Sequence, residues 1–131
     1  MANKRASLPT LHELEAEVMD AVWTLDEASV RQVMDALNAK TAKPRAYTTY
    51  MTIMRRLDGK GVLHRRREGK TDFYRPAHSR DEYARLRAQT EVEALVDRYG
   101  EAALGHFARQ IAQLDPERRK ALERLARRAE G

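Results

Sequence analysis

The stretch 46-AYTTYMTIMRRLDGKG-61 decides the fold, because it predicts one amphipathic helix with two unlike faces. The outer face carries threonines and arginines where a solvated helix usually has Glu, Lys, Gln or Ala. Threonine lowers helix propensity because its β-branch restricts its rotamers. The outer face is therefore predicted to serve something other than helix stability. The opposite, apolar stripe follows helical spacing and is formed, with Tyr47 beside it, by Tyr50, Ile53, Met54 and Leu57.

Two helices are predicted before this stretch. Thr10 and Glu13 have the spacing of a capping box, and apolar residues follow them at helical intervals. Ser29 and Gln32 repeat the capping pattern before a second, shorter helix. Pro44 then interrupts the chain, because it cannot donate a backbone hydrogen bond and it disfavours helical angles at the preceding residue.

A β-hairpin is predicted after the third helix. Either Gly59 or Gly61 can end that helix in a left-handed conformation, which suits a residue without a Cβ. The β-prone runs 62–67 and 71–76 follow, joined by a tight turn at 68–70.

The inner face of the hairpin needs apolar anchors, which we expect to be Leu63 and either Phe73 or Tyr74. Its arginines would then point outward. Three helices followed by a hairpin is the order of a winged helix-turn-helix domain, which we expect over residues 8–77.

Residues 78–131 predict three further amphipathic helices, the last opened by Asp115 as N-cap and Pro116 at the first helical position. Segments this small with so few large apolar groups cannot form a stable core alone. We expect them to form a dimerisation domain with a second copy of the chain; the alternative is packing onto the N-terminal domain. The expected contact residues are Tyr83, Leu86, Leu95, Tyr99, Leu104, Phe107, Ile111, Leu114, Leu122 and Leu125.

The net charge of +5 is concentrated in the middle of the chain. Residues 40–75 hold eleven basic and three acidic side chains, a net charge of +8, whereas residues 1–39 have a net charge of −4. Such a field is what a surface that binds a polyanion requires. Charge alone does not separate this interpretation from a solvated basic face.

A helix-turn-helix unit inserts its second helix into the major groove of DNA, and the outer face of residues 46–61 fits that role. The groove offers hydrogen-bond partners to threonine hydroxyls, thymine methyls to Thr and Met, and guanine O6 and N7 to arginine. The expected base-reading residues are Thr48, Met51, Thr52 and Arg55. The predicted hairpin, residues 62–76, is the wing of such a domain. The expected phosphate contacts are Thr49, Arg56 and Lys60 on the helix and Arg65, Arg66, Arg67 and Lys70 on the wing.

The sequence thus predicts a mainly α protein, a winged helix-turn-helix DNA-binding domain followed by a three-helix C-terminal dimerisation domain. Two copies would present two recognition helices to a palindromic site. The alternative from another class is a winged-helix interaction module whose basic face binds an acidic protein partner, because the fold alone does not establish DNA binding.

Other classes of protein are disfavoured by what the sequence lacks. It has no run of about 20 apolar residues for a membrane span and no signal peptide, so we expect a cytoplasmic protein with no membrane insertion. It has no cysteine for thiol catalysis or thiolate metal sites. The four histidines lie far apart in sequence, and no phosphate loop or nucleophile elbow is present. We expect neither an enzyme nor a metal or cofactor.

The runs 11-LHELEAEVMDAVW-23, 30-VRQVMDAL-37 and 47-YTTYMTIMRRL-57 resemble the penicillinase-repressor family (BlaI/MecI). The resemblance implies a bacterial winged-helix transcriptional repressor that acts as a homodimer. It would control β-lactamase or related cell-wall-stress genes, and hence antibiotic resistance. A membrane-bound, penicillin-sensing metalloprotease is the further partner that the resemblance implies.

The resemblance also implies inactivation by cleavage of an Asn-Phe bond in the second helix of the dimerisation domain. The matching position in this chain reads His106-Phe107, so the phenylalanine is kept and the asparagine is replaced. We expect Phe107 to act as a core aromatic in either case.

Overall fold

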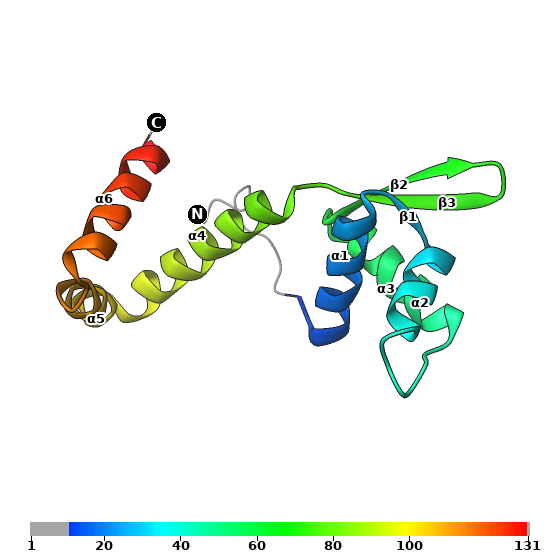
Figure 1. The fold of residues 1–131 in the computed structure, drawn as a ribbon, viewed down its shortest axis with the longest axis horizontal. Helices are drawn as coiled ribbons and strands as arrows, with labels where there is room; N and C mark the ends of the chain where they lie inside the picture. The colour runs from blue at the N-terminus through cyan, green and yellow to red at the C-terminus, as the bar shows by residue number, and fades with distance from the viewer. Residues whose placement is uncertain (1–10, 131) are drawn as a thin grey trace. The chain divides into compact units, whose positions relative to one another are not determined.

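The computed structural model describes residues 11–130, in the helix and strand order predicted from the sequence with one short strand added (Figure 1). The helices are α1 (Glu13–Leu25), α2 (Val30–Asn38), α3 (Tyr47–Gly59), α4 (Arg80–Tyr99), α5 (Glu101–Ala112) and α6 (Pro116–Glu130). The strands are β1 (Ala28–Ser29), β2 (Leu63–Glu68) and β3 (Thr71–Pro76). The fold is mainly α-helical with a small antiparallel sheet, as predicted.

Capping hydrogen bonds explain where three of the helices begin. At the start of α2 the Gln32 N–H donates to the Ser29 hydroxyl (3.2 Å), and the Ser29 N–H donates to the Gln32 side chain (2.8 Å). This capping box was predicted. The Asp115 carboxylate accepts from the Arg118 N–H at 2.8 Å, which caps α6 as expected. Thr10 lies outside the described residues; α1 begins after His12, whose N–H donates to Glu15 Oε1 at 3.0 Å.

Gly61 is the glycine that ends α3. Its φ of 79° is left-handed, and its N–H donates to the Asp58 carbonyl at 3.0 Å. The next N–H, of Val62, reaches back to the Leu57 carbonyl at 2.9 Å. This pair of bonds is a Schellman motif, which turns the chain sharply from α3 into β2.

The sheet has the strand order β1-β3-β2, with every pairing antiparallel. A two-residue turn joins β2 to β3, and Gly69 at its first position has a φ of 63°. Strand β1 was not predicted, because two residues are too few to show a period of two. It pairs Ala28 with Tyr74 and Ser29 with Phe73, and so ties the hairpin to the helices.

The structure divides into two compact units, and the division falls between Thr90 and Glu91 within α4. The first turns of α4 belong to the first unit because of Tyr83, which is 9% exposed and whose ring lies 5.5 Å from that of Trp23. The Trp23 indole also donates to the His78 carbonyl at 2.9 Å. Tyr83 was expected at the contact between copies; it is a core residue of the first unit instead.

The first unit has one continuous apolar core, where α1, α2 and α3 meet the base of the hairpin. Tyr74 is the second hairpin anchor beside Leu63, being 1% exposed, whereas Phe73 is half-buried. The largest fully buried apolar side chains are Met19, Tyr50, Met54, Leu57, Leu63 and Tyr74.

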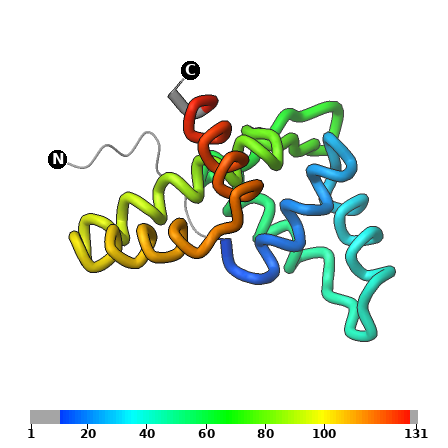
Figure 2. Tube along the Cα trace, turned by 60° about the vertical axis from the view of Figure 1, so that its left-hand side comes forward, coloured from blue at the N-terminus to red at the C-terminus, as the bar shows by residue number. Residues whose placement is uncertain are grey.

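Among residues 91–128, the second unit shows no such core. The chain turns sharply at Gly100 and again between α5 and α6 (Figure 2). No residue of α5 is buried, and Leu104 and Leu125 are 53% and 55% exposed. Within residues 11–130, no helix combines the length and apolar character that a bilayer crossing needs.

Candidate nucleic-acid interface

Helix α3 presents opposite chemistry on its two faces. Its inner residues, predicted as the core stripe, are all at most 7% exposed: Tyr50, Ile53, Met54 and Leu57. On the outer face, Thr48, Thr52, Arg55 and Arg56 are exposed, and Thr49 and Met51 are half-buried. The face is therefore open to a ligand, with hydroxyls, methyl groups and guanidinium groups along it.

Asn38, the last residue of α2, holds α3 in position. Its amide donates to the Arg45 carbonyl and accepts from the Arg45 N–H, both at 3.0 Å. Its oxygen also accepts from the Tyr50 hydroxyl at 2.7 Å. One side chain thus closes the turn before α3 and fixes a core residue of α3, which sets the angle between the two helices.

A second polar link holds the other end of α3. The Lys60 ammonium lies 2.9 Å from Glu15 Oε2, and Glu15 is only 1% exposed. Burial raises the pKa of Glu15, but the His12 N–H and Lys60 outweigh it, and the pKa lies below its ordinary value. Lys60 was expected to contact phosphate; its charge is instead paired with a buried carboxylate in α1.

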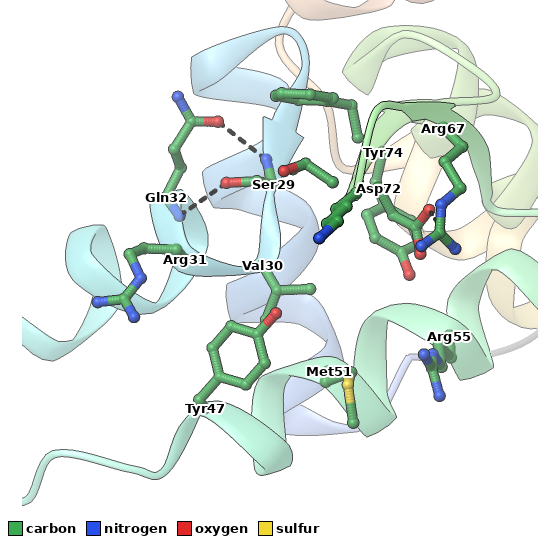
Figure 3. A pocket seen from close by; sticks show the side chains of 13 residues that line it. Ser29, Val30, Arg31, Gln32, Tyr47, Met51, Arg55, Arg67, Asp72 and Tyr74 are labelled. Atoms are coloured by element: carbon green, nitrogen blue, oxygen red, sulfur yellow. Dashed lines mark hydrogen bonds and ion pairs between the residues drawn. The ribbon is translucent and has the colours of Figure 1, made fainter.

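A groove of about 610 Å³ runs between α3, the start of α2 and the wing (Figure 3). Met51 and Arg55 of α3 line it on one side, and Arg67 and Lys70 of the wing line it on another. Four cationic side chains thus border one concave surface: Arg31, Arg55, Arg67 and Lys70. Such a surface can hold a chain of phosphates while α3 projects beyond it.

Two residues of the groove were missed by the sequence argument. Arg31 lies in the first turn of α2 and was counted only as a base in an acidic region. Tyr47 was placed beside the core stripe but is 44% exposed, because at the first residue of α3 it faces the groove. The capping box at Ser29 could have indicated Arg31, since side chains just after an N-cap project from the helix start.

The arginines of the wing differ in how closely they are paired with carboxylates. Arg65 and Arg67 each lie 3.8 Å from Asp72, and Arg65 lies at the same distance from Asp58. These distances are long for ion pairs, and the side chains of Arg65 and Arg67 are 45% and 66% exposed, so a DNA phosphate can replace the carboxylates at a small cost in free energy. Lys70 at the tip has no ion pair within the described part of the chain.

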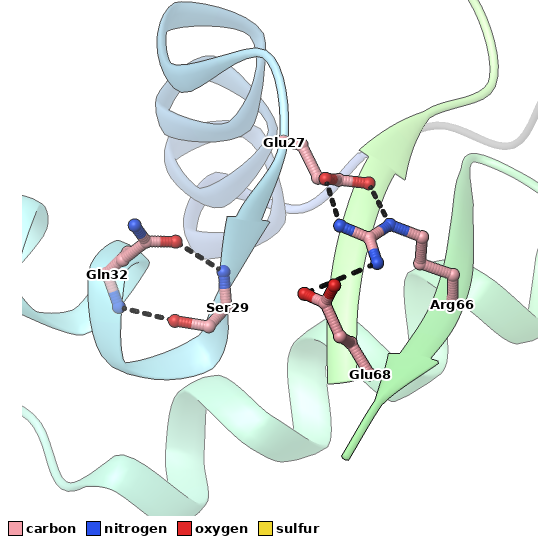
Figure 4. A network of polar contacts seen from close by, with 5 residues as sticks. All are labelled: Glu27, Ser29, Gln32, Arg66 and Glu68. Atoms are coloured by element: carbon pink, nitrogen blue, oxygen red, sulfur yellow. Dashed lines mark hydrogen bonds and ion pairs between the residues drawn. The ribbon is translucent and has the colours of Figure 1, made fainter. Parts of the chain in front are cut away.

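Arg66 is held differently from its neighbours (Figure 4). It donates through Nε and one terminal nitrogen to both carboxylate oxygens of Glu27, at 2.9 and 2.8 Å. The hydrogen bond from Arg66 holds the pKa of Glu27 below its ordinary value, and the same bond raises the pKa of Arg66. Predicted as a phosphate contact, Arg66 is engaged with protein on the side of the sheet that carries Phe73.

The second unit exposes large apolar side chains among its charged ones. Leu95 and Tyr99 of α4 and His106 and Phe107 of α5 line a cavity of about 250 Å³. His106 is exposed and Phe107 is half-buried. Large apolar side chains that remain exposed on these helices, besides Leu104 and Leu125, are Val92, Leu95, Tyr99, Ile111 and Leu122. Exposed apolar side chains of this kind are typical of interaction sites.

The family model described as penicillinase repressor matches residues 11–128. The chain belongs to this family. The repressor is 38% identical over 108 residues to the transcriptional regulator BlaI of Mycobacterium tuberculosis strain H37Rv, covering 81% of this chain and 77% of that one. BlaI of strain CDC 1551 matches to the same extent.

Two solved structures are also similar to the repressor. One is the solution structure of the DNA-binding domain of the repressor BlaI, with 26% identity and a TM-score of 0.51 over 59% of this chain and 92% of that one. The other is monomeric Bacillus licheniformis BlaI in complex with the blaP half-operator, with 27% identity, a TM-score of 0.48 and the same coverage. The family and the DNA-binding-domain relative make this chain a DNA-binding transcriptional repressor, and not an enzyme.

Proposed function

We propose that the repressor binds a palindromic DNA operator as a homodimer and controls β-lactamase or related cell-wall-stress genes. The observation that carries this proposal is the outer face of α3, where Thr48, Thr52 and Arg55 are exposed beside a cation-lined groove. The name of the family and the half-operator bound by the Bacillus relative support the choice of operator and genes.

In this proposal α3 enters the major groove and reads bases. Thr48, Met51, Thr52 and Arg55 lie on the face that reaches base edges, where hydroxyl, methyl and guanidinium groups each have matching partners. The sugar-phosphate backbone that borders the major groove of DNA would lie in the cation-lined groove of the protein, beside α3. Phosphate contacts then come from Thr49 and Arg56 of α3, Arg65, Arg67 and Lys70 of the wing, and Arg31 of α2. Lys60 is left out of this set because Glu15 holds its charge.

The second unit would supply the contact between two copies of the repressor. Its helices expose apolar side chains that one copy alone leaves in water, and burial of such surface drives association. The proposed contact includes the half-buried Leu114 and Phe107 together with the exposed residues Leu95, Tyr99, Leu104, Ile111, Leu122 and Leu125. Leu86, which precedes the division within α4, was expected there too and extends the proposed contact into the first unit. A two-fold pair of recognition helices would fit half-sites spaced by about one helical turn, roughly 34 Å, or a multiple.

A gel-shift titration against the repressor's own upstream DNA tests the function. A sequence reader that neutralises phosphates prefers one duplex over random DNA, and its affinity falls steeply with salt. The same affinity for all duplexes would contradict the proposal, and so would salt-independent binding. The former is what a module for an acidic protein partner would give on DNA, because a basic face binds phosphates without reading sequence.

Variants separate base reading from phosphate contact. Thr52→Ala or Arg55→Ala should relax preference at a defined operator position by about 1–3 kcal/mol. Arg67→Ala should weaken specific and random DNA alike, because phosphates carry no sequence information. If both kinds of variant affected the two DNAs equally, the division of roles would be wrong.

Release from DNA would follow a β-lactam signal, with a membrane-bound β-lactam-sensing metalloprotease as the proposed further partner. The bond at issue, between His106 and Phe107, lies within α5, so a protease would need that helix to unwind locally. The test treats cells with a β-lactam and blots for a fragment ending at His106. Release from the promoter by a full-length repressor would exclude cleavage as the trigger.

A further inference from the structure

Arg66 is one of three paired residues that lie side by side on the three strands of the sheet. On β2 it pairs with Phe73 of β3, and Phe73 pairs with Ser29 of β1. The Arg66 guanidinium carbon is 4.9 Å from the centroid of the Phe73 ring. From there the guanidinium reaches Glu27, two residues before Ser29 (Figure 4). Arg66 thus spans the face of β3 and joins the outer strand to the segment that follows α1.

The guanidinium group has little capacity left for another anion. Two of its nitrogens donate to Glu27, and the third lies 3.6 Å from Glu68 Oε2. A bidentate arginine–carboxylate pair fixes both position and orientation, unlike the 3.8 Å contacts of Arg65 and Arg67, in which one nitrogen faces each carboxylate. A DNA phosphate would have to displace Glu27 before Arg66 could bind it.

Beyond its buried base, the outer strand of the wing has few side-chain contacts that would hold it beside α3. In β2 only Leu63 is buried, and every residue from His64 to Glu68 is exposed. The backbone of β2 pairs only with β3 among the described strands, since the order is β1-β3-β2. Besides the ladder with β3, the buried Leu63 and the 3.8 Å contact of Arg65 with Asp58 of α3, the Arg66–Glu27 pair is a further attachment of the outer strand, and it has the shortest ion-pair distances of any on β2.

We propose that Arg66 is a positioning residue, which together with Glu27 fixes the wing next to the recognition helix and does not itself contact DNA. This inference rests on the proposed function. Simple electrostatics predicts that an acidic residue on a DNA-binding domain weakens DNA binding. The proposal predicts the opposite for Glu27, which should strengthen it. Its carboxylate favours the complex by ordering the wing before DNA arrives, and such preorganisation reduces the entropy lost on binding.

The operator affinity of the full-length Glu27→Gln variant, compared with that of the wild type, tests the proposal by the sign of the change. Removing a negative charge near DNA strengthens binding if charge is all that matters. We expect Glu27→Gln to weaken binding about two- to fivefold per half-site, the scale of a partly exposed ion pair. The matched control is Glu68→Gln, which removes the same charge from the wing but leaves the bidentate pair intact, and it should bind at least as tightly as wild type. Tighter or unchanged binding by Glu27→Gln would overturn the inference.

The salt dependence of binding gives a readout that loss of structure alone would not mimic. A lost phosphate contact lowers the slope of log affinity against log salt by about 0.9 per copy bound. Arg67→Gln should show that decrease, whereas Arg66→Gln should weaken binding with the slope unchanged. Arg66→Lys keeps the charge but not the planar fork, so it should behave like Arg66→Gln. A slope that falls for Arg66→Gln and is restored by Arg66→Lys would show a phosphate contact and contradict the proposal.

Thermal unfolding of each variant, followed by far-UV circular dichroism, sets a temperature at which all are folded, and binding is compared there. A double-mutant cycle over Glu27→Gln and Arg66→Gln should show that the second substitution adds little to the first. Additive losses would overturn the inference. If the wild-type repressor showed no preference for any duplex, the proposed function itself would be refuted. If the wild type preferred its operator but Glu27→Gln bound that operator more tightly, only the role of Arg66 would be refuted.

Discussion

The two units of the repressor differ in how far their apolar side chains are buried. In the first unit, α1, α2, α3 and the hairpin share one core, and side chains such as Tyr50 and Leu57 are fully buried. In the second unit, α5 has no buried residue, and leucines such as Leu104 are more than half exposed. A unit with its own core can fold alone, whereas a unit with exposed apolar helices acquires its core from a partner. In the proposed function, DNA contact and assembly are thereby divided between two parts of one chain.

The largest expected effect comes from removing the second unit. A chain that ends at Thr90 should keep the fold of the first unit, with its far-UV circular dichroism and cooperative unfolding. Its affinity for a duplex with two half-sites should fall about 100-fold or more, because joining two weak contacts raises effective concentration. Affinity for a single half-site is the control and should not change. Full-site binding as tight as that of the intact chain would mean that the second unit does not join the copies.

Matched leucine substitutions in the two units sharpen the comparison. Leu57→Ala removes a side chain that is 0% exposed, and it should lower the free energy of unfolding by about 2–4 kcal/mol at any protein concentration. Leu104→Ala changes a residue that is 53% exposed, so it should weaken self-association instead. Unfolding by urea and sedimentation equilibrium distinguish the two. Equal effects of both variants on monomer stability would contradict the division into units.

The buried pair between α1 and α3 predicts an asymmetric result. Lys60→Met leaves Glu15 buried without its cation and should destabilise the first unit by about 2 kcal/mol or more. Glu15→Gln leaves an ammonium that is 29% exposed and can reach water, so its effect should be smaller. Chemical unfolding of the two variants measures the difference. The reverse order would mean that Lys60 contributes little in the folded state.

The pH dependence of the same pair follows from the lowered pKa of Glu15. Because the folded pKa lies below the ordinary 4.5, the pair stabilises the fold above that pH, and the contribution is lost as pH falls through the folded pKa. The difference in unfolding free energy between wild type and Lys60→Met should thus be largest near neutral pH and shrink below about 4.5. A difference that stays constant from pH 7 to pH 3 would exclude this linkage.

The smallest effect is expected at the end of α3. Gly61 has a φ of 79°, and a Cβ added there would meet no atom within 4 Å. Gly61→Ala should therefore destabilise the first unit only through its backbone, by about 1 kcal/mol. The exposed Gly59 has open space for a Cβ and no left-handed angle, so Gly59→Ala is the control and should not destabilise. Equal loss at both sites would show that the left-handed conformation is not the cause.

Sequence periodicity predicted the local features of the molecule well. The apolar stripe of α3, the capping box at Ser29 and the helix order depend on residues within a few positions of one another. What it missed involves partners far apart in the chain. Lys60 pairs with a residue 45 positions away, and Arg66 with one 39 positions away. No local pattern carries that information, so all basic residues of the wing looked alike. The exposed position of Tyr47 was missed for a related reason, since the groove forms only when the wing folds beside α3.

The most direct test selects bound duplexes from a random DNA library with the full-length repressor and with Arg55→Ala. The account predicts that wild type enriches one sequence with two-fold symmetry, with half-site centres separated by about one helical turn or a multiple. Arg55→Ala should lose preference at the same position in both half-sites. Enrichment of a single, unpaired half-site would contradict the two-copy arrangement. Enrichment that is identical for wild type and Arg55→Ala would contradict base reading through the outer face of α3.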